Sequence, residues 1–140
     1  MKVYVDTSFL VSLYSLDANS PKAVQAMSAG DHFVTTFGEL EFANALELRI
    51  FRKEVSAVQA RASAKDFEKD LGNGVFQLRP LTEQAFEGAR QLSRQTTARL
   101  GTRTADLLHV AAALDLGADY LYTFDQQQRK LAQAVRLKLN

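Results

Sequence analysis

Short strand-forming runs alternate with helix-length segments along this chain, and this alternation constrains the fold more than any other feature. The strand-forming runs share β-branched and aromatic residues, and they are KVYV (2–5), HFVTT (32–36), VFQLR (75–79), YLYTF (120–124) and a fifth candidate in VRLKL (135–139). The helical segments are 8–15, 21–29, 39–52, 56–71, 82–100, 102–116 and 125–134. Such alternation predicts an α/β fold, a three-layer α/β/α sandwich around a parallel sheet of four to five strands.

Residues that cap or break helices set the expected ends of these segments. Pro21 suits a first helical position, while Ser56 and Thr82 suit N-caps. The run Gly72-Asn73-Gly74 ends one of the helices, and Gly101 ends another. In segment 39–52, helical spacing predicts a buried stripe formed by Leu40, Ala43, Leu46 or Glu47, and Ile50.

The composition is that of an ordinary globular chain. Its 140 residues fit one domain spanning 1–140, with no linker or repeat. Hydrophobic residues make up 46% and charged residues 24%, and the net charge of +1 is not that of a strongly basic nucleic-acid-binding tail. The lack of cysteine suits a reducing compartment, and the expected location is cytoplasmic. The N-terminus does not resemble a signal peptide, and no apolar run approaches a membrane span, so no membrane association is expected.

Carboxylates stand where the predicted strands and helices end. Asp6 follows the first strand and Asp125 follows the fourth, so both leave the sheet at its carboxyl edge. Glu41 is expected in the first turn of the helix after the second strand, close to the same edge. Asp106 begins the helix that feeds the fourth strand, and it joins the others only if that helix starts at this edge. Ligands of open parallel sheets bind at such an edge.

Four converging carboxylates predict a metal site. At an effective dielectric of about 20, two carboxylates about 5 Å apart repel by roughly 3 kcal/mol, so a cation or protons must neutralise the cluster. Oxygen ligands alone favour Mg²⁺ or Mn²⁺. Such ions lower the pKa of bound water and neutralise phosphate oxygens, which is the chemistry of phosphodiester hydrolysis. Each acid also has a plain explanation, because Asp6 and Asp125 suit N-caps, Glu41 suits a first helical turn, and Asp106 could pair with Arg103.

Several other side chains lie near the expected edge. The candidates for a supporting role are Thr7, Ser8, Asn44 and Thr123. His109, three residues after Asp106, is expected to be a packed histidine rather than a general base, and His32 is expected at the surface. Several basic side chains near these segments could contact an RNA backbone, although the default expectation is that they are solvated or paired with acids. They are Arg49, Arg52, Lys53, Arg99 and Arg103.

At these residues the chain resembles the PIN-domain nucleases, and most of all the VapC-type toxins of bacterial or archaeal toxin–antitoxin systems. The resemblance rests on VYVDTSFLVSLY, ELEFANALELRIFR, RTADLLHVAAALDLGADYLYTFD and QRKLA, and so spans almost the whole chain. It implies an α/β/α fold and a metal-dependent endoribonuclease that binds Mg²⁺ or Mn²⁺. It further implies a homodimer and an antitoxin that blocks the site. The acids that match the family's catalytic and metal-binding residues are Asp6, Glu41, Asp106 and Asp125.

Other α/β proteins fit the chain less well. A phosphatase of the haloacid-dehalogenase type needs a second aspartate two residues after the first, where this chain has Ser8. A receiver domain needs an aspartate after a middle strand, and VFQLRPL offers none. A Rossmann domain needs a glycine fingerprint after the first strand, which is missing here. The remaining alternative is a non-catalytic RNA-binding module on the same fold, which would hold RNA unchanged in Mn²⁺ whereas a nuclease would cut it.

Overall fold

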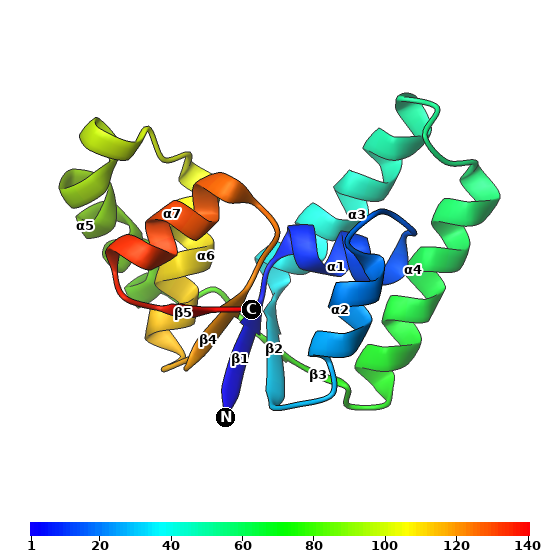
Figure 1. Cartoon of the computed structure of the whole chain (residues 1–140), viewed down its shortest axis with the longest axis horizontal. Helices are drawn as coiled ribbons and strands as arrows, with labels where there is room; N and C mark the ends of the chain where they lie inside the picture. Colours follow the sequence, from blue (N-terminus) through cyan, green and yellow to red (C-terminus); the bar gives the residue numbers. More distant parts are fainter.

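The computed structural model describes all residues 1–140, and it forms five parallel strands between two layers of helices (Figure 1). The elements in chain order are β1 (Lys2–Val5), α1 (Thr7–Tyr14), α2 (Ser20–Ala26), β2 (Asp31–Thr35), α3 (Thr36–Phe51), α4 (Ala57–Gly72), β3 (Phe76–Arg79), α5 (Glu83–Leu100), α6 (Thr104–Asp115), β4 (Tyr120–Tyr122), α7 (Gln126–Ala134) and β5 (Lys138–Leu139). The three-layer α/β/α sandwich predicted from the alternation is confirmed, and the terminal run does form a fifth strand.

The strand order is β3-β2-β1-β4-β5, so the chain leaves β1 toward one side of the sheet and returns to the other side with β4. Tyr4 of β1 pairs in register with Phe33 of β2 and Leu121 of β4. The order of connection therefore reverses between β1 and β4. In open parallel sheets, such a reversal leaves a crevice at the carboxyl ends of the strands.

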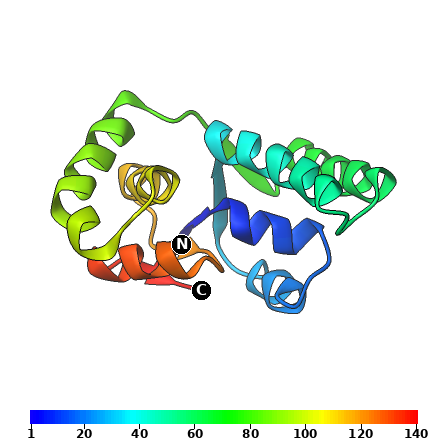
Figure 2. The same cartoon turned by 90° about the horizontal axis from the view of Figure 1, so that it is seen from above.

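Alternating side chains of β1 pack into two separate hydrophobic cores. Tyr4 packs with α5, α6 and α7 on one face, while Val3 and Val5 pack with α1 to α4 on the other. Figure 1 shows these two helical layers on opposite sides of the sheet, and Figure 2 shows them from above. The run Val3-Tyr4-Val5 is fully buried because both faces of a parallel sheet are covered. None of the helices is both long and apolar enough to cross a membrane.

Two helix starts and one helix end have the expected caps. The side chains of Ser56 and Thr82 accept hydrogen bonds from the backbone N–H groups of Gln59 and Ala85, and Gly101 ends α5 in the left-handed conformation that favours glycine. By contrast, α3 begins three residues earlier than predicted, since Thr35 at the end of β2 caps it directly through the N–H of Gly38.

The structure corrects two expectations about α3. Glu41 lies in the second turn, and the acid of the first turn is Glu39. The buried face is centred on Phe42 and Leu46, whereas Leu40 is 67% exposed. The predicted stripe was therefore wrong at Leu40 and Ala43, which are both exposed, because the buried face follows Phe42, Leu46 and Ile50 at a spacing of four residues.

His32 also lies elsewhere than expected. It is the second residue of β2, only 5% exposed, and its ring packs beside Phe76 and Tyr122. The surface position predicted for it is wrong, because β2 is flanked by β1 and β3 and helices cover the sheet. Its Nε2 atom has no hydrogen-bond partner, and burial lowers the pKa of His32, with Asp31 opposing the shift only in part.

We expect the stability of this protein to fall in mild acid because of His32. Its pKa in the folded state lies below the unfolded value near 6.5, so the unfolded chain binds more protons as the pH falls through that range. The loss can reach about 1.4 kcal/mol per pH unit for one proton. Urea unfolding from pH 7.5 to 5 would measure it, and His32→Leu should remove this component of the slope. Equal slopes in the two proteins would contradict the assignment.

Candidate active site

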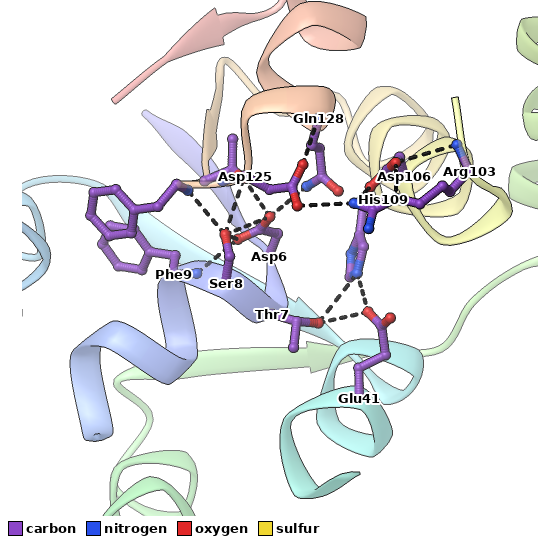
Figure 3. Close-up of polar contacts among 12 residues, drawn as sticks. Asp6, Thr7, Ser8, Phe9, Glu41, Arg103, Asp106, His109, Asp125 and Gln128 are labelled. Carbon is purple, nitrogen blue, oxygen red and sulfur yellow. Dashed lines mark hydrogen bonds and ion pairs between the residues drawn. The ribbon is translucent and has the colours of Figure 1, made fainter. Parts of the chain in front are cut away.

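The candidate site lies at the carboxyl edge of the sheet, between β1 and β4. A cleft of about 640 Å³ opens there, and its lining includes Asp6, Glu41, Asp106 and Asp125. The four acids come from the loop after β1, the second turn of α3, the first turn of α6 and the loop after β4. The condition placed on Asp106 is therefore met, since α6 does begin at this edge. Figure 3 shows the four side chains around the same space.

Asp6 is the most enclosed of the four acids, at 2% exposure. One carboxylate oxygen accepts from the N–H of Phe9 at 2.9 Å, so the side chain does cap α1. The other accepts from the Thr123 hydroxyl and from Nε2 of Gln128 at 2.7 Å, and Ser8 donates to the carboxylate as well. Burial raises the pKa of Asp6, and the nearby His109 ring together with the hydrogen bonds from Thr123, Phe9 and Ser8 offsets the shift only in part.

Asp6 therefore has two roles that the sequence presented as alternatives. It caps α1, and it also faces the cleft shared with the other acids. None of its hydrogen-bond partners is a cation, although the carboxylate is buried. A buried carboxylate without a positive partner is electrostatically costly, and it draws either a proton or a cation.

Glu41 reaches the cleft from α3 and is held from two sides. The Thr7 hydroxyl donates to its carboxylate at 2.6 Å, and Nε2 of His109 makes a short contact with the same oxygen. Burial raises the pKa of this carboxyl, but the hydrogen bonds from His109 and Thr7 and the nearby charge of Arg103 together outweigh that effect, and the net pKa is below its ordinary value. Glu41 is thus held as a carboxylate.

Asp106 and Asp125 share one cation. The guanidinium of Arg103 contacts Asp106 through Nε at 3.0 Å and Nη2 at 3.1 Å, and Nη2 also reaches Asp125 at 2.9 Å. Asp125 in addition caps α7 by accepting from the N–H of Gln128. The two carboxylates raise the pKa of Arg103, so the guanidinium remains charged. The ion pair between Asp106 and Arg103 that the sequence suggested is present, and Arg103 also forms an ion pair with Asp125.

The predicted supporting residues divide into two groups. Thr7, Ser8 and Thr123 contact Asp6 or Glu41 as described, whereas Asn44 is exposed, has no side-chain hydrogen bond and does not line the cleft. Asn44 lies three residues after Glu41 and so near it on the helix, but the side that faces the cleft carries Ala45, Leu48, Arg49 and Arg52.

The basic residues also fall into two groups, those that line the cleft and those that do not. Arg49, Arg52 and Arg103 line the cleft, whereas Lys53 and Arg99 do not. Arg49 is already engaged, since it donates to Ser15 and pairs with Asp17 and Glu54. Arg52 is exposed and has no ion pair. Arg52 is therefore the cleft arginine that is free to meet an incoming anion.

Gln128 is the contact that the sequence did not reveal. It is fully buried among the polar groups of the site and donates to Asp6 from α7, 122 residues later in the chain. One signal was present, because a glutamine three residues after the capping Asp125 places its side chain in the first turn of α7. A pattern of that kind is common in surface helices, so it does not single out a buried partner.

The donor set fits a hard divalent cation. The cleft presents carboxylate oxygens with hydroxyl oxygens beside them and no thiolate, and its innermost carboxylate, Asp6, has no cationic partner. No three acidic or histidine side chains are close enough together to form a ready metal-binding group, and each acid is held by its own protein donors. Since Arg103 contacts oxygens of both Asp106 and Asp125, a cation would compete with this arginine for them.

Comparison with known proteins agrees with this architecture. The family model of the PIN domain matches residues 3–134, while no curated protein matches the chain. Among solved structures, VapC20 of Mycobacterium tuberculosis, described as a sarcin-ricin loop cleaving toxin, superposes with a TM-score of 0.70 at 21% identity, over 91% of this chain and 93% of that chain. FitAcB of Neisseria gonorrhoeae superposes with a TM-score of 0.72 at 15% identity, over 98% of this chain and 95% of that chain.

A third structure covers the whole chain. VapBC2 of Rickettsia felis, bound to a DNA fragment from its promoter, superposes with a TM-score of 0.69 at 14% identity, over 100% of this chain and 98% of that chain. At these identities the likeness shows a common fold. The family match extends over every helix and over β1 to β4 apart from Lys2, and on that basis the chain belongs to the PIN domain family.

Proposed function

We propose that this protein is a metal-dependent endoribonuclease and the toxin of a type II toxin–antitoxin pair. One observation carries the proposal: the buried carboxylate of Asp6, which has no cationic partner, faces a cleft lined by Glu41, Asp106 and Asp125. A binding module would have no need to keep an unpaired carboxylate at the base of its cleft, since that arrangement lowers stability. A hydrolase gains from it when a divalent cation completes the site.

In this proposal Asp6, Glu41, Asp106 and Asp125 hold Mg²⁺ or Mn²⁺, directly or through water. When bound, the ion neutralises charge on the scissile phosphate and lowers the pKa of a water, and the expected products carry 5′-phosphate and 3′-hydroxyl ends.

The protein's own groups prepare the site. Thr123 and Gln128 fix the Asp6 carboxylate by donating to it, and Thr7 and His109 do the same for Glu41. Arg52, free at the cleft rim, is placed to contact an RNA phosphate.

The alternative is a PIN-fold module that binds RNA without cutting it. The two are distinguished by incubating the purified protein with an end-labelled pool of random-sequence RNA in Mn²⁺ and in EDTA. We expect cleavage only with Mn²⁺, yielding products with 5′-phosphates. Retention of intact RNA in both conditions would favour the binding module instead.

The toxin role makes a separate claim about the cell. Expression of the protein alone should arrest growth, and co-expression of the protein encoded beside it should restore growth if that neighbour is the antitoxin. The similar solved structures include a toxin–antitoxin complex from Klebsiella pneumoniae, which supports the search for such a partner. Normal growth on expression alone would argue against the toxin role.

We also propose that the protein is a homodimer, which sedimentation would test, and that it is located in the cytoplasm.

Arg103 should oppose metal binding, because its guanidinium occupies oxygens of Asp106 and Asp125. We expect Mg²⁺ to raise the melting temperature of the wild type, and to raise that of Arg103→Gln further. A tenfold gain in affinity would add about 1.4 kcal/mol at saturating metal, or roughly 3–5 °C for a domain of this size. Thermal unfolding across a Mg²⁺ titration measures this shift. Arg90→Gln is the matched control, since Arg90 is exposed and pairs only with Glu87. Equal metal-induced shifts in all three proteins would contradict the competition.

A further inference from the structure

A chain of buried polar groups runs beneath the cleft and ends at Glu41. It starts at Thr35 at the end of β2, passes through the Tyr4 hydroxyl of β1, and continues through the His109 ring of α6. Thr35 and Tyr4 are fully buried, and His109 is 2% exposed. Three segments far apart in sequence thus converge on the carboxylate of α3, and Figure 3 shows its last contact, between His109 and Glu41.

The direction of the hydrogen bonds in this chain follows from counting donors and acceptors. Oγ1 of Thr35 accepts from the N–H of Gly38 at 3.0 Å, which leaves the Thr35 hydroxyl hydrogen free to go to the Tyr4 oxygen at 3.1 Å. Burial raises the pKa of Tyr4, so its hydroxyl keeps its hydrogen. That hydrogen then points at Nδ1 of His109, 2.8 Å away. Nδ1 is therefore an acceptor, and the ring proton is on Nε2.

The other arrangements of the ring leave a buried group unsatisfied. With its proton on Nδ1 alone, His109 would donate to Tyr4, and the buried Thr35 hydroxyl hydrogen would have no acceptor. The lone pair of Nε2 would also face the Glu41 carboxylate at short range, even if the Thr7 hydroxyl, 3.3 Å away, donated to it. With protons on both nitrogens, His109 would donate to Tyr4 and Tyr4 to Thr35, so the buried Thr35 hydroxyl hydrogen would have no acceptor. A buried polar group without a partner costs about 1–3 kcal/mol. Only the neutral ring with Nε2–H satisfies every group.

We propose that His109 is a positioning residue for Glu41. Its Nε2–H donates to the carboxylate, and Thr35 and Tyr4 hold the ring in the tautomer that makes this possible. Phe37 packs on the ring, with centroids 5.1 Å apart, and restricts its rotation. With Thr7 donating to the same oxygen, the second carboxylate oxygen of Glu41 remains without a protein donor and is available to the cleft. The inference concerns how Glu41 is oriented, and its meaning for metal binding rests on the proposed function.

The tautomer can be observed directly. In the metal-free wild-type protein labelled with ¹⁵N-histidine, long-range ¹H–¹⁵N spectra at pH 7 distinguish the three protonation forms of each ring, and His32→Leu assigns the two signals. We expect the pattern of a neutral ring protonated on Nε2 for His109, and a mixture of forms in Tyr4→Phe. A proton on Nδ1, or a doubly protonated ring, in the wild type would overturn the proposed hydrogen-bond direction.

The positioning role is measured by Mn²⁺ affinity, from the loss of the free-Mn²⁺ electron paramagnetic resonance signal on binding. Loss of such a supporting contact typically weakens metal affinity about 10–100-fold, and we expect that for His109→Leu. His109→Gln should recover part of it, because its amide can still donate to Glu41. His32→Leu is the matched control, as it removes the other buried histidine away from the cleft and should leave the affinity unchanged.

The outcomes separate the two proposals. If the wild type binds Mn²⁺ and His109→Leu binds it equally well while remaining folded, His109 does not position Glu41 and the metal site stands. If all variants lose affinity alike, including His32→Leu, the effect is one of general stability and the positioning role is wrong. If the wild type binds no Mn²⁺ at millimolar concentration, the proposed metal site fails, and the role of His109 toward it fails too.

Discussion

Asp6→Asn should abolish Mn²⁺-dependent RNA cleavage while the protein stays folded. Asp6 is the buried carboxylate at the base of the cleft, and an amide supplies neither its charge nor its second acceptor oxygen. A bound divalent ion contributes several kcal/mol to hydrolysis, and about 4 kcal/mol corresponds to roughly 10³-fold in rate. Single-turnover cleavage of a labelled RNA would measure the loss.

The stability of the same variant makes the test specific. Burial raises the pKa of Asp6, so the charged form is disfavoured in the folded protein, and removal of the charge should offset part of the cost of placing an amide NH2 group against the donors of Thr123 and Gln128 or of Phe9. Thermal unfolding of the metal-free variant should therefore still show a cooperative transition. Asp66→Asn is the control, because Asp66 is an exposed carboxylate on α4 outside the cleft. Wild-type cleavage by Asp6→Asn would refute the assignment, and so would an equal loss in Asp66→Asn.

Phe9→Ala should lower the free energy of unfolding by about 3–5 kcal/mol. Phe9 is fully buried. Its ring stacks on that of Phe124, with ring centroids 5.4 Å apart, and it packs beside the ring of Tyr122, with centroids 5.2 Å apart. It therefore ties the turn that carries Asp6 to the end of β4, which leads to Asp125. Removing the ring leaves a cavity that the covered sheet cannot easily close. Urea unfolding at pH 7.5 would measure the change.

The chain offers a matched control of identical chemistry. Phe51, at the end of α3, is 83% exposed, so Phe51→Ala should change the free energy of unfolding by no more than about 0.5 kcal/mol. Similar losses in the two variants would mean that the core around Phe9 does not hold this edge of the sheet together, and that the packing described for β1 and β4 is incorrect.

The fold was predictable from the sequence because its signals are local. Val3-Tyr4-Val5 is apolar at every position, as a strand covered on both faces requires, and Ser56, Thr82 and Gly101 mark helix ends through contacts within three or four residues. The prediction was wrong at the start of α3, where Thr35 ends a strand and caps a helix at once. No local pattern shows that one residue serves both elements.

The placement of the acids was predictable for a related reason. In a parallel sheet, residues that follow strands must lie at one edge, so the alternation already placed Asp6 and Asp125 at the same edge. The structure adds that their strands, β1 and β4, are adjacent. The position of Asp106 needed the structure, because the sequence left open where α6 begins relative to that edge. The catalytic use of these acids stays a prediction.

The amino-acid sequence by itself determined the layered architecture and the place of Asp6 and Asp125 at the carboxyl edge of the sheet, because both follow from patterns within a few residues. Only the tertiary structure decided the partner of each carboxylate: Gln128 for Asp6, His109 for Glu41, and a shared Arg103 for Asp106 and Asp125. It also buried His32, which the sequence placed at the surface. Hydrogen bonds and burial of this kind join residues from separate helices and strands, and only the packing of those elements brings the groups together.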